Sequence, residues 1–562
     1  MEQPTNQPGI PTFDIEALAW TIPIAIGFYD GERYHEFLKE KESDDIVWKF
    51  LQFLEEHYYG YRIYAHCASK FDNKFIMASL VQHNEIIDME MGLISLKWKR
   101  MEISFEDSYL LIPSSLERAA KLFGVEEKKI WNHKETLNPW EMGSKLGVFR
   151  DYLKTDCISL SQIMFKVCEL LGTNFGVMPS ISLSTTAVKV FDKCFHKVDK
   201  IDSNEEFEDF IREAIYGGRN EVYQKYGEGI NIYDIKSMYV SCYNYPVPVG
   251  KLRWIKPDLS KGTLAEAVVK VPKDLYIGPL PLRKGGKLIF PVGEFRSWWD
   301  TEELTNALRF GVDLDIKRQL CADEEPVMTG FGQFIGRIRG NKQDEFWKMF
   351  GLSVTGKFGQ SRWRDEIKHI SEIEDLKGWL PIDTNETYFA TKKYMTGKSP
   401  YIKPAVDMRI RARARIKHLD FILEASKKGK VFYGDTDSIY TTSRLKSGTQ
   451  VGDLVNLGKA ERGYFIRQKL YAVIQKGKMR QKSAGYSDLK LSEEDFKTML
   501  AGKSIETDTE NLPAFRSILK TGEFNLFMKG RKIKISESKD NRLTIGNDTQ
   551  PICLTLKDSP ED

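Results

Sequence analysis

Val431-Phe-Tyr-Gly-Asp-Thr-Asp-Ser-Ile-Tyr440 is the segment that decides the fold, because it sets two carboxylates between apolar flanks. The flanks predict two strands joined by a tight turn, a β-hairpin with Asp435 and Asp437 at its tip. Glycine and aspartate are common in ordinary turns, so a plain surface turn is the alternative. The aliphatic and aromatic flanks instead place the acids beside a core. Neighbouring carboxylates there need a cation, and hard oxygen ligands suit Mg²⁺.

Two further segments upstream carry residue types that suit the same chemistry. In Ile230-Asn-Ile-Tyr-Asp-Ile-Lys-Ser-Met-Tyr239, Asp234 ends an apolar strand. Taken alone, such an aspartate is more often a helix N-cap than a metal ligand. Trp347-Lys-Met-Phe-Gly-Leu-Ser-Val-Thr-Gly-Lys-Phe-Gly359 holds Lys348 and Lys357, nine residues apart on a predicted helix. Taken alone, that helix is amphipathic with solvated lysines.

A second group of acids lies near the N-terminus. Phe13-Asp-Ile-Glu16 puts two acids on one face of a strand, because side chains alternate along a strand. His66-Cys-Ala-Ser-Lys-Phe-Asp72 adds a third acid. Tyr152 and Asp156, four apart on a predicted helix, share a face. Alternating acids can be a solvent-facing edge, but the apolar neighbours favour a buried strand.

Together these segments resemble motifs A, B and C of B-family DNA polymerases, preceded by the three Exo motifs of DnaQ-like 3′–5′ exonucleases. The resemblance implies two Mg²⁺ ions per active site, with Mn²⁺ as a substitute. It implies polymerase metal ligands at Asp234, Asp437 and the Ile235 carbonyl, with Asp435 as a supporting carboxylate. It implies nucleotide contacts from Ser237, Lys348, Lys357, Arg337 and Tyr239, the last as a gate against a ribose 2′-hydroxyl. It implies exonuclease metal ligands at Asp14, Glu16, Asp72 and Asp156, with Tyr152 orienting the attacking water.

Several residues depart from the usual motifs. Met238 and Val240 stand where leucine and proline are usual in motif A, and three others bear on base selection and proofreading. Leu352 stands where asparagine is usual and Thr355 where tyrosine is usual, positions that line the nascent base pair in the family. Cys67 replaces an asparagine that contacts the single-stranded 3′ end. These departures bear on base selection and proofreading, because the acids that carry the chemistry are kept.

The chain is also similar to the small protein-primed polymerases of phages and linear plasmids. Asp107-Ser-Tyr-Leu-Leu-Ile112 resembles a segment that this branch uses for single-stranded DNA and terminal protein, and Tyr216-Gly-Gly-Arg219 resembles its linker motif. Lys482 to Tyr486 weakly matches a Lys-x-Tyr motif that grips the primer, with a solvated loop as the alternative. DNA contacts are therefore expected from Ser108, Tyr216, Gly217, Gly218, Arg219, Lys482 and Tyr486.

The resemblance implies an α/β and α+β multidomain fold. An RNase H-like exonuclease domain is expected over residues 1–178. A right-hand polymerase domain is expected over 179–562, with fingers at about 325–362, a small insertion at about 364–398 and a thumb at about 490–562. Hydrophobic periodicity predicts the strands Thr12–Ala17, Ile22–Tyr29, Arg62–Ala65, Gly229–Tyr233, Gly262–Val271 and Lys430–Tyr433. It predicts the helices Asp45–His57, Ser115–Phe123, Tyr152–Leu171, Asp344–Phe350 and Ala405–Ala425.

Composition sets wider limits. The chain has 562 residues, 41% of them hydrophobic and 29% charged, with a net charge of +3. This permits nucleic-acid binding only through clustered charge. Basic clusters at 409–417, 476–482 and 529–534 are expected to follow DNA phosphates, with a solvated helix face as the alternative for the first. Seven scattered cysteines without a C-x-x-C pair indicate a reducing, intracellular setting, the host cytoplasm for a viral protein. We do not expect secretion or membrane binding. We expect the protein to be a monomer.

The expected function is a template-directed DNA polymerase with a proofreading exonuclease. It would replicate a linear viral or plasmid genome by protein-primed initiation and strand displacement. Expected partners are primer–template DNA, single-stranded DNA, dNTPs and a terminal protein. The alternatives are a primer-dependent polymerase without a terminal protein, an exonuclease with an impaired polymerase, and a catalytically silent DNA-binding scaffold.

Overall fold

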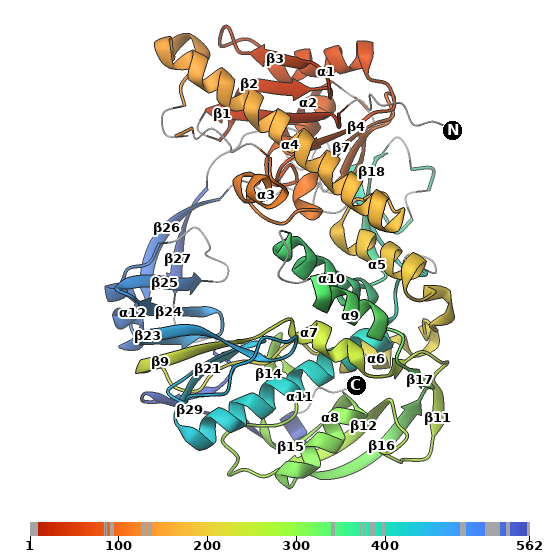
Figure 1. The fold of residues 1–562 in the computed structure, drawn as a ribbon, viewed down its shortest axis with the longest axis vertical. Coiled ribbons are helices and arrows are strands. Elements are labelled where there is room, and N and C mark those ends of the chain that lie inside the picture. The colour runs from red at the N-terminus through yellow and green to blue at the C-terminus, as the bar shows by residue number, and fades with distance from the viewer. Residues whose placement is uncertain are drawn as a thin grey trace.

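The computed structural model describes residues 9–18, 20–83, 85, 87–89, 95–125, 131–132, 136–338, 343–370, 373–375, 377–381, 389–395, 399–483, 490–511, 529–535 and 540–558. Figure 1 shows an N-terminal unit at the top and a larger unit below it, each built around a seven-stranded sheet. No helix of these described stretches is both long and apolar enough to cross a membrane.

The N-terminal sheet has the strand order β3-β2-β1-β4-β7-β6-β5. Its strands are β1 (Thr12–Leu18), β2 (Ile22–Tyr29), β3 (Tyr34–Leu38), β4 (Arg62–Ala65), β5 (Ile87–Met89), β6 (Ser95–Trp98) and β7 (Ile103–Asp107). The first three strands are antiparallel, whereas β1, β4 and β7 run parallel.

Helices cover both faces of this sheet. Phe13 and Ile15 point into a core made with α1 (Ile46–His57) and α2 (Asp72–Gln82). The intervening side chains face α4 (Leu146–Phe175), since the Thr12 hydroxyl donates to the carbonyl of Cys157 on that helix at 2.7 Å. Period-two alternation therefore turns the acids of β1 toward α4.

The sheet of the larger unit has the order β25-β24-β23-β9-β22-β21-β8. Its strands are β8 (Asn220–Val222), β9 (Tyr226–Ile235), β21 (Val431–Asp435), β22 (Ser438–Thr441), β23 (Leu454–Arg467), β24 (Leu470–Gln475) and β25 (Lys478–Ser483). Helix α11 (Pro404–Lys428) packs on one face, with Ile410 and Ile422 in the same core as Tyr233 of β9. The other face is lined by aromatic residues, including Tyr433, Tyr440 and Tyr471.

Three groups of elements surround this sheet. Helices α9 (Thr329–Ile338) and α10 (Asp344–Phe358) occupy the region expected to form the fingers. A sheet ordered β18-β20-β19 occupies the expected insertion, with the strands β18 (Trp363–His369), β19 (Leu380–Pro381) and β20 (Phe389–Met395). A five-stranded sheet ordered β11-β16-β12-β15-β30 lies at the bottom of Figure 1. Its strands are β11 (Arg253–Ile255), β12 (Leu264–Val271), β15 (Val292–Asp300), β16 (Asp313–Cys321) and β30 (Cys553–Leu554).

One continuous apolar core joins the N-terminal unit to the fingers region. Helices α3 (Leu116–Phe123), α4 and α5 (Leu183–Cys194) share it with α9, α10 and α11. Phe123 of α3 meets Phe346 of α10 edge to face at 5.7 Å between ring centroids.

The region expected to form the thumb contains two separately placed parts. Helix α12 (Glu493–Leu500) and the hairpin of β26 (Ile505–Asn511) and β27 (Lys529–Ile535) lie beside β23 to β25 (Figure 1). The segment 540–558 returns instead to the body of the larger unit. There Arg542 pairs with Glu221 at 3.2 Å, and β30 lies parallel to β15. The thumb boundary of 490–562 stays a prediction.

Candidate active sites

The predicted carboxylate hairpin is confirmed as a structural feature. Strands β21 and β22 pair antiparallel, and Thr436 at the tip has a φ of 62°. β22 also pairs with β9, so that Ser438 lies opposite Asp234. The Ile235 N–H donates to the Asp437 carbonyl at 2.8 Å. The fold thus brings the two sequence-distant segments that hold Asp234 and Asp437 onto adjoining strands.

Asp435 is buried and held by basic and polar side chains. It forms ion pairs with Lys469 and, at 3.5 Å, with Lys482. The Asn220 side chain donates to the same carboxylate at 2.9 Å. These contacts balance its charge and fix the hairpin, which agrees with the supporting position expected for it.

Asp437 has a different environment. Burial raises its pKa and Asp435 adds to the rise, whereas Lys348 and Lys469 oppose it. The positive charge of Lys348, on α10, therefore lowers the pKa of the Asp437 carboxyl group. This places the lysine near the carboxylate hairpin, where a nucleotide-binding lysine is expected. A half-buried acid with a second acid close by is a donor set that a divalent cation would stabilise.

Tyr239 lies next to the same carboxylates. It follows Ser237, whose φ is 49°, in the short helix α7 (Met238–Ser241). Burial raises the pKa of Tyr239; Arg411 and Arg415 oppose this and Asp437 adds to it. Its ring packs partly buried against the main core. Tyr239 therefore lies close enough to Asp437 to be affected by its charge.

The remaining nucleotide-binding candidates lie on the fingers helices. Arg337 is exposed in the last turn of α9, and Lys357 is half-buried in the last turn of α10. Thr355 is buried, and its hydroxyl lies 2.5 Å from that of Tyr243. Tyr243 also donates to the carbonyl of Gly351 at 2.8 Å. Thr355 therefore faces Tyr243 inside the protein and leaves the lining of a base-pair pocket to other residues.

The N-terminal acids meet in one pocket. Its lining residues include the five expected from the sequence, which are Asp14, Glu16, Asp72, Tyr152 and Asp156. They come from β1, the first turn of α2 and the middle of α4. The prediction that distant segments bring these side chains together is confirmed.

Burial dominates the electrostatics of this pocket. It raises the pKa of Asp72 to about 7; the Ile15 N–H, 3.0 Å away, opposes the rise, and Asp107 and Glu16 add to it. Burial also raises the pKa of Tyr152, with further contributions from Glu16 and the other acids. Such a pocket disfavours several negative charges at once and would be stabilised by bound cations. Among the described residues, no three acidic, histidine or cysteine side chains are already placed to hold an ion, so the metal sites stay predictions.

Several pocket residues were not singled out from the sequence. Trp20, 47% exposed, and His66 both line the acidic pocket. The His66 Nε2 lies 2.7 Å from the Ser114 carbonyl, which fixes its ring. Cys67 lies beside them with a φ of 62°, and burial raises the pKa of its thiol to about 11. Trp20 follows Glu16 by four residues in the sequence, but its exposure and its place in the pocket are visible only in the structure.

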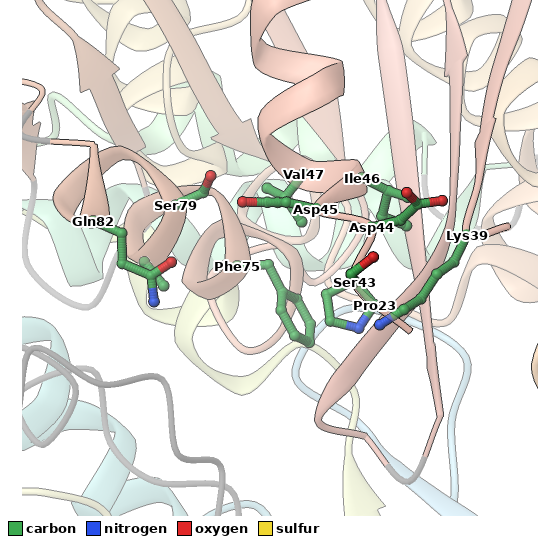
Figure 2. A pocket seen from close by; sticks show the side chains of 11 residues that line it. Pro23, Lys39, Ser43, Asp44, Asp45, Ile46, Val47, Phe75, Ser79 and Gln82 are labelled. Carbon is green, nitrogen blue, oxygen red and sulfur yellow. The ribbon is translucent and has the colours of Figure 1, made fainter. Parts of the chain in front are cut away.

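Figure 2 shows a different pocket, on the same unit, where the start of α1 meets α2. Asp45, Phe75 and Ser79 are among its lining residues. None of the predicted exonuclease acids lines this pocket; they line the acidic pocket described above.

The side chains of three residues that we expected to contact DNA are instead buried inside the protein. Ser108 is buried, and its hydroxyl donates to the Ala65 carbonyl at 3.1 Å. Tyr216 is buried, with its hydroxyl 2.7 Å from that of Ser297. The Arg219 guanidinium is 1% exposed and pairs with Glu221 at 2.5 Å. These polar groups are already occupied inside the protein, so they stabilise the fold in place of binding DNA.

One of the two linker glycines, Gly218, has a steric reason. A Cβ on Gly218 would come within 2.6 Å of the Thr436 side chain at the tip of the carboxylate hairpin. The Thr436 N–H also donates to the Arg219 carbonyl at 2.7 Å. Gly218 therefore lets the linker pass close behind the hairpin, whereas a Cβ on Gly217 would meet only the Leu288 side chain at an ordinary 3.7 Å. Contact of either glycine's backbone with DNA stays a prediction.

The Lys-x-Tyr spacing is met by residues that the sequence interpretation overlooked. Lys469 and Tyr471 flank Leu470, and Tyr486 lies outside the described residues. Lys469 pairs with Asp435, and the Tyr471 hydroxyl lies 3.0 Å from that of Tyr440. Lys482 also reaches Asp435, so it belongs to the same site although its predicted partner cannot be placed.

Most of the basic cluster of α11 is engaged by acids inside the protein. Four of its arginines form ion pairs within the protein, and two of them are buried. The pairs are Arg409 with Asp300, Arg411 with Asp407, Arg413 with Glu302, and Arg415 with Glu303. For the buried Arg409 and Arg415 neither phosphate binding nor a solvated face agrees with the structure, whereas for the half-buried Arg411 and Arg413 the expected phosphate contact stays a prediction.

Comparison with known proteins places this geometry in a family. A family described as DNA polymerase type B, organellar and viral, matches residues 55–135 and 124–327. A probable DNA polymerase of Ascobolus immersus is 26% identical over 431 residues, covering 63% of this chain and 35% of the relative. One of Neurospora intermedia is 23% identical over 575 residues, covering 83% and 57%. The DNA-directed DNA polymerase of Enterobacteria phage PRD1 is 26% identical over 224 residues, covering 39% and 35%. The chain thus spans about a third to a little over half the length of these relatives.

Solved structures agree in fold. Phi29 DNA polymerase complexed with primer-template DNA and incoming nucleotides has a TM-score of 0.68 at 16% identity, covering 90% of this chain and 97% of that one. The same polymerase complexed with single-stranded DNA has a TM-score of 0.67 at 15% identity, covering 97% and 100%. The expected fold class, an exonuclease-type unit followed by palm, fingers and thumb, is confirmed.

Proposed function

The chain belongs to the type B DNA polymerases of the organellar and viral kind, and on that basis we propose that it is a template-directed DNA polymerase. It would join a dNTP to the 3′-hydroxyl of a primer. The observation that carries the proposal is the pairing of β9, β22 and β21, which sets Asp234 beside a hairpin with Asp437 at its tip. A surface turn would not need its second acid, Asp435, clamped by Lys469 and Asn220.

The carboxylates of Asp234 and Asp437 and the carbonyl of Ile235 would hold two Mg²⁺ ions, or Mn²⁺ in their place. Such ions lower the cost of negative charge on the attacking and leaving oxygens during phosphoryl transfer. Asp435, neutralised by Lys469 and Lys482, keeps the hairpin in place without competing for the ions.

The other residues act on the nucleotide. Lys348 would bind the triphosphate, since its charge already acts on Asp437. Ser237 and Tyr239 would line the sugar site, where the ring of Tyr239 excludes a 2′-hydroxyl. Arg337 and Lys357 would bind phosphate when the fingers helices approach the palm.

Primer extension by the Asp437→Asn variant tests this proposal. The change keeps the shape of the side chain and removes its charge, so incorporation should fall by at least about 10³-fold. A matched control is Asp453→Asn, on the turn that precedes β23, which should extend primers normally. Robust extension by the Asp437 variant would refute the assignment.

We further propose that the N-terminal unit is a 3′–5′ proofreading exonuclease. Asp14, Glu16, Asp72 and Asp156 would hold metal ions, and Tyr152, on the same pocket wall, would orient the attacking water. The Asp14→Ala, Glu16→Ala double variant should lose degradation of a labelled single strand and keep primer extension. Degradation that persists in the pure variant would assign this activity elsewhere.

Protein-primed replication of a linear viral or plasmid genome is the finer proposal. Its support is the linker Tyr216-Gly-Gly-Arg219 running directly behind the catalytic hairpin, together with a small sheet between the fingers and α11 where the branch carries its insertion. Incubation with a candidate terminal protein, an origin fragment and labelled dNTP should attach one dNMP to a hydroxyl of that protein. Extension only of oligonucleotide primers would favour a primer-dependent enzyme.

A further inference from the structure

His418 is a buried polar side chain of α11 that packs against the carboxylate hairpin. It is 0% exposed, and its Nε2 lies 3.1 Å from the carbonyl oxygen of Ser438, the first residue of β22. Its ring also lies against the glycine of the hairpin, since a Cβ on Gly434 would come within 3.2 Å of the His418 Cε1. Helix α11 therefore reaches the backbone of the hairpin directly after Asp437.

The direction of this hydrogen bond is fixed by chemistry. Burial lowers the pKa of His418 to about 4, the bond to Ser438 opposes the fall and Arg219 adds to it, so the ring is neutral near neutral pH. A carbonyl oxygen can only accept, so the single proton of the neutral ring lies on Nε2. Among the described residues, the buried Nδ1 has no hydrogen-bond partner.

Fold stability alone does not favour a histidine at this position. A buried acceptor without a partner costs free energy comparable to what one hydrogen bond contributes, so the two largely offset each other. An apolar side chain would fill the same space without that cost. Ile422, one turn further along α11, does so, because its Cδ1 lies 3.2 Å from the same Cβ position on Gly434. What His418 adds to packing is the bond to Ser438.

That bond completes a set of three anchors on consecutive residues of the hairpin. The Thr436 N–H donates to the linker at 2.7 Å, and the Asp437 carbonyl accepts an N–H of β9 at 2.8 Å. The Ser438 carbonyl accepts from His418. The linker, β9 and α11 thus each hold one residue of the tip. A misplacement of about 1 Å can cost an enzyme about 10²-fold in rate, so such anchoring bears on catalysis.

We propose that His418 is a positioning residue for nucleotide incorporation, whose bond to Ser438 holds the carboxylate of Asp437 in its reactive place. The proposal rests on the polymerase function proposed above and deepens it by adding a residue outside the polymerase motifs. The competing explanation is a core histidine that only fills space between α11 and the sheet.

Primer extension with kcat and KM for dNTP determined separately tests the assignment. His418→Leu keeps the packing and removes the donor, so kcat should fall about tenfold, the worth of one hydrogen bond, with little change in KM. His418→Gln, whose amide N–H can replace that of Nε2, should restore most of kcat. The matched control is Ile422→Val, which trims a side chain against the same glycine; it should lower the melting temperature and leave kcat unchanged.

Two binding measurements separate positioning from folding. The affinity for primer–template in EDTA should be the same for the leucine variant as for the wild type, because the DNA contacts are untouched. Mn²⁺ binding, followed by electron paramagnetic resonance with Asp14→Ala and Glu16→Ala also present, reports on the palm acids. It should weaken several-fold in the leucine variant and not in the Ile422 variant. If the leucine variant binds primer–template poorly, His418→Met, which also lacks a donor, takes its place.

The outcomes distinguish the two proposals. A wild-type kcat in the leucine variant would overturn the positioning role. Equal losses of kcat in the leucine and glutamine variants, with Mn²⁺ binding unchanged in both, would assign His418 to core packing. Absence of primer extension by the wild-type chain would instead refute the polymerase proposal.

Discussion

Replacing Arg415 by methionine should destabilise the larger unit strongly, because the arginine lies inside it as half of a buried ion pair. Arg415 and Glu303 are 2% and 3% exposed and joined by two hydrogen bonds of 2.8 and 2.6 Å. A third bond of 2.6 Å runs from Arg415 to the carbonyl of Tyr216. Removing one partner of such a pair leaves an uncompensated charge and costs about 3–5 kcal/mol.

A second variant separates the two contributions to this loss of stability, the unpaired Glu303 charge and the unsatisfied Tyr216 carbonyl. In Arg415→Met with Glu303→Met the orphaned charge is gone, and the remaining loss is that of the unsatisfied Tyr216 carbonyl, about 1–3 kcal/mol. Arg309→Met is the control, since its pair with Asp420 is exposed on both sides and such pairs contribute about 0–1 kcal/mol. Urea unfolding followed by tryptophan fluorescence gives the ranking.

The pH dependence of the single variant provides an independent check. Burial already raises the pKa of Glu303, and Arg415 opposes that rise. Without the arginine the folded-state pKa lies further above the unfolded value, so the folded state binds more protons. Stability then falls as pH rises through the interval between the two values, and the variant should be less destabilised at pH 5 than at pH 8. A loss no greater than that of Arg309→Met, or one independent of pH, would refute the reasoning.

Two further changes test local geometry. Cys67→Asn should raise the free energy of unfolding by about 0.5–1 kcal/mol, because the left-handed backbone of Cys67 costs most residues about 1–2 kcal/mol and asparagine less. A melting temperature at or below that of the wild type would contradict this. Tyr243→Phe removes the hydrogen bonds that join the palm to α10, each about 1 kcal/mol. In steady-state kinetics the Tyr243 variant should raise KM for dNTP several-fold with little change in kcat. The control Tyr245→Phe, which alters an exposed ring, should change neither constant.

Much of the local structure could be predicted from sequence pattern. The strands Ile22–Tyr29 and Arg62–Ala65 have the predicted bounds, since turn residues or charges end each apolar run. The helix predicted at Tyr152–Leu171 extends to Leu146–Phe175; before Tyr152 only Phe149 is buried, so this added stretch carries little apolar periodicity. Local signals define where such elements lie and leave their ends imprecise.

The arginines of α11 show what such signals cannot supply. Their spacing is visible in the sequence, but only Arg411 pairs within the helix, with Asp407. The other three pair with Asp300 at the end of β15 and with Glu302 and Glu303 just after it, more than a hundred residues upstream. Whether a charge meets a phosphate or an internal carboxylate depends on packing between distant helices. The acids of both candidate sites were predictable for the opposite reason, since their strand and helix positions follow from short-range periodicity and motif order.

The position of the catalytic hairpin depends on both ends of the larger unit. Behind its tip, the Thr436 N–H is bonded to the Arg219 carbonyl. The Arg219 guanidinium and Arg542, from the returning C-terminal segment, bind opposite oxygens of the buried Glu221 at 2.5 and 3.2 Å. Removing either arginine leaves part of the buried Glu221 charge uncompensated and so destabilises β8, the strand that pairs with β21 of the hairpin. The linker and the C-terminal segment therefore act together as a brace for Asp437, which explains why a linker resembling a DNA-binding motif has its arginine buried.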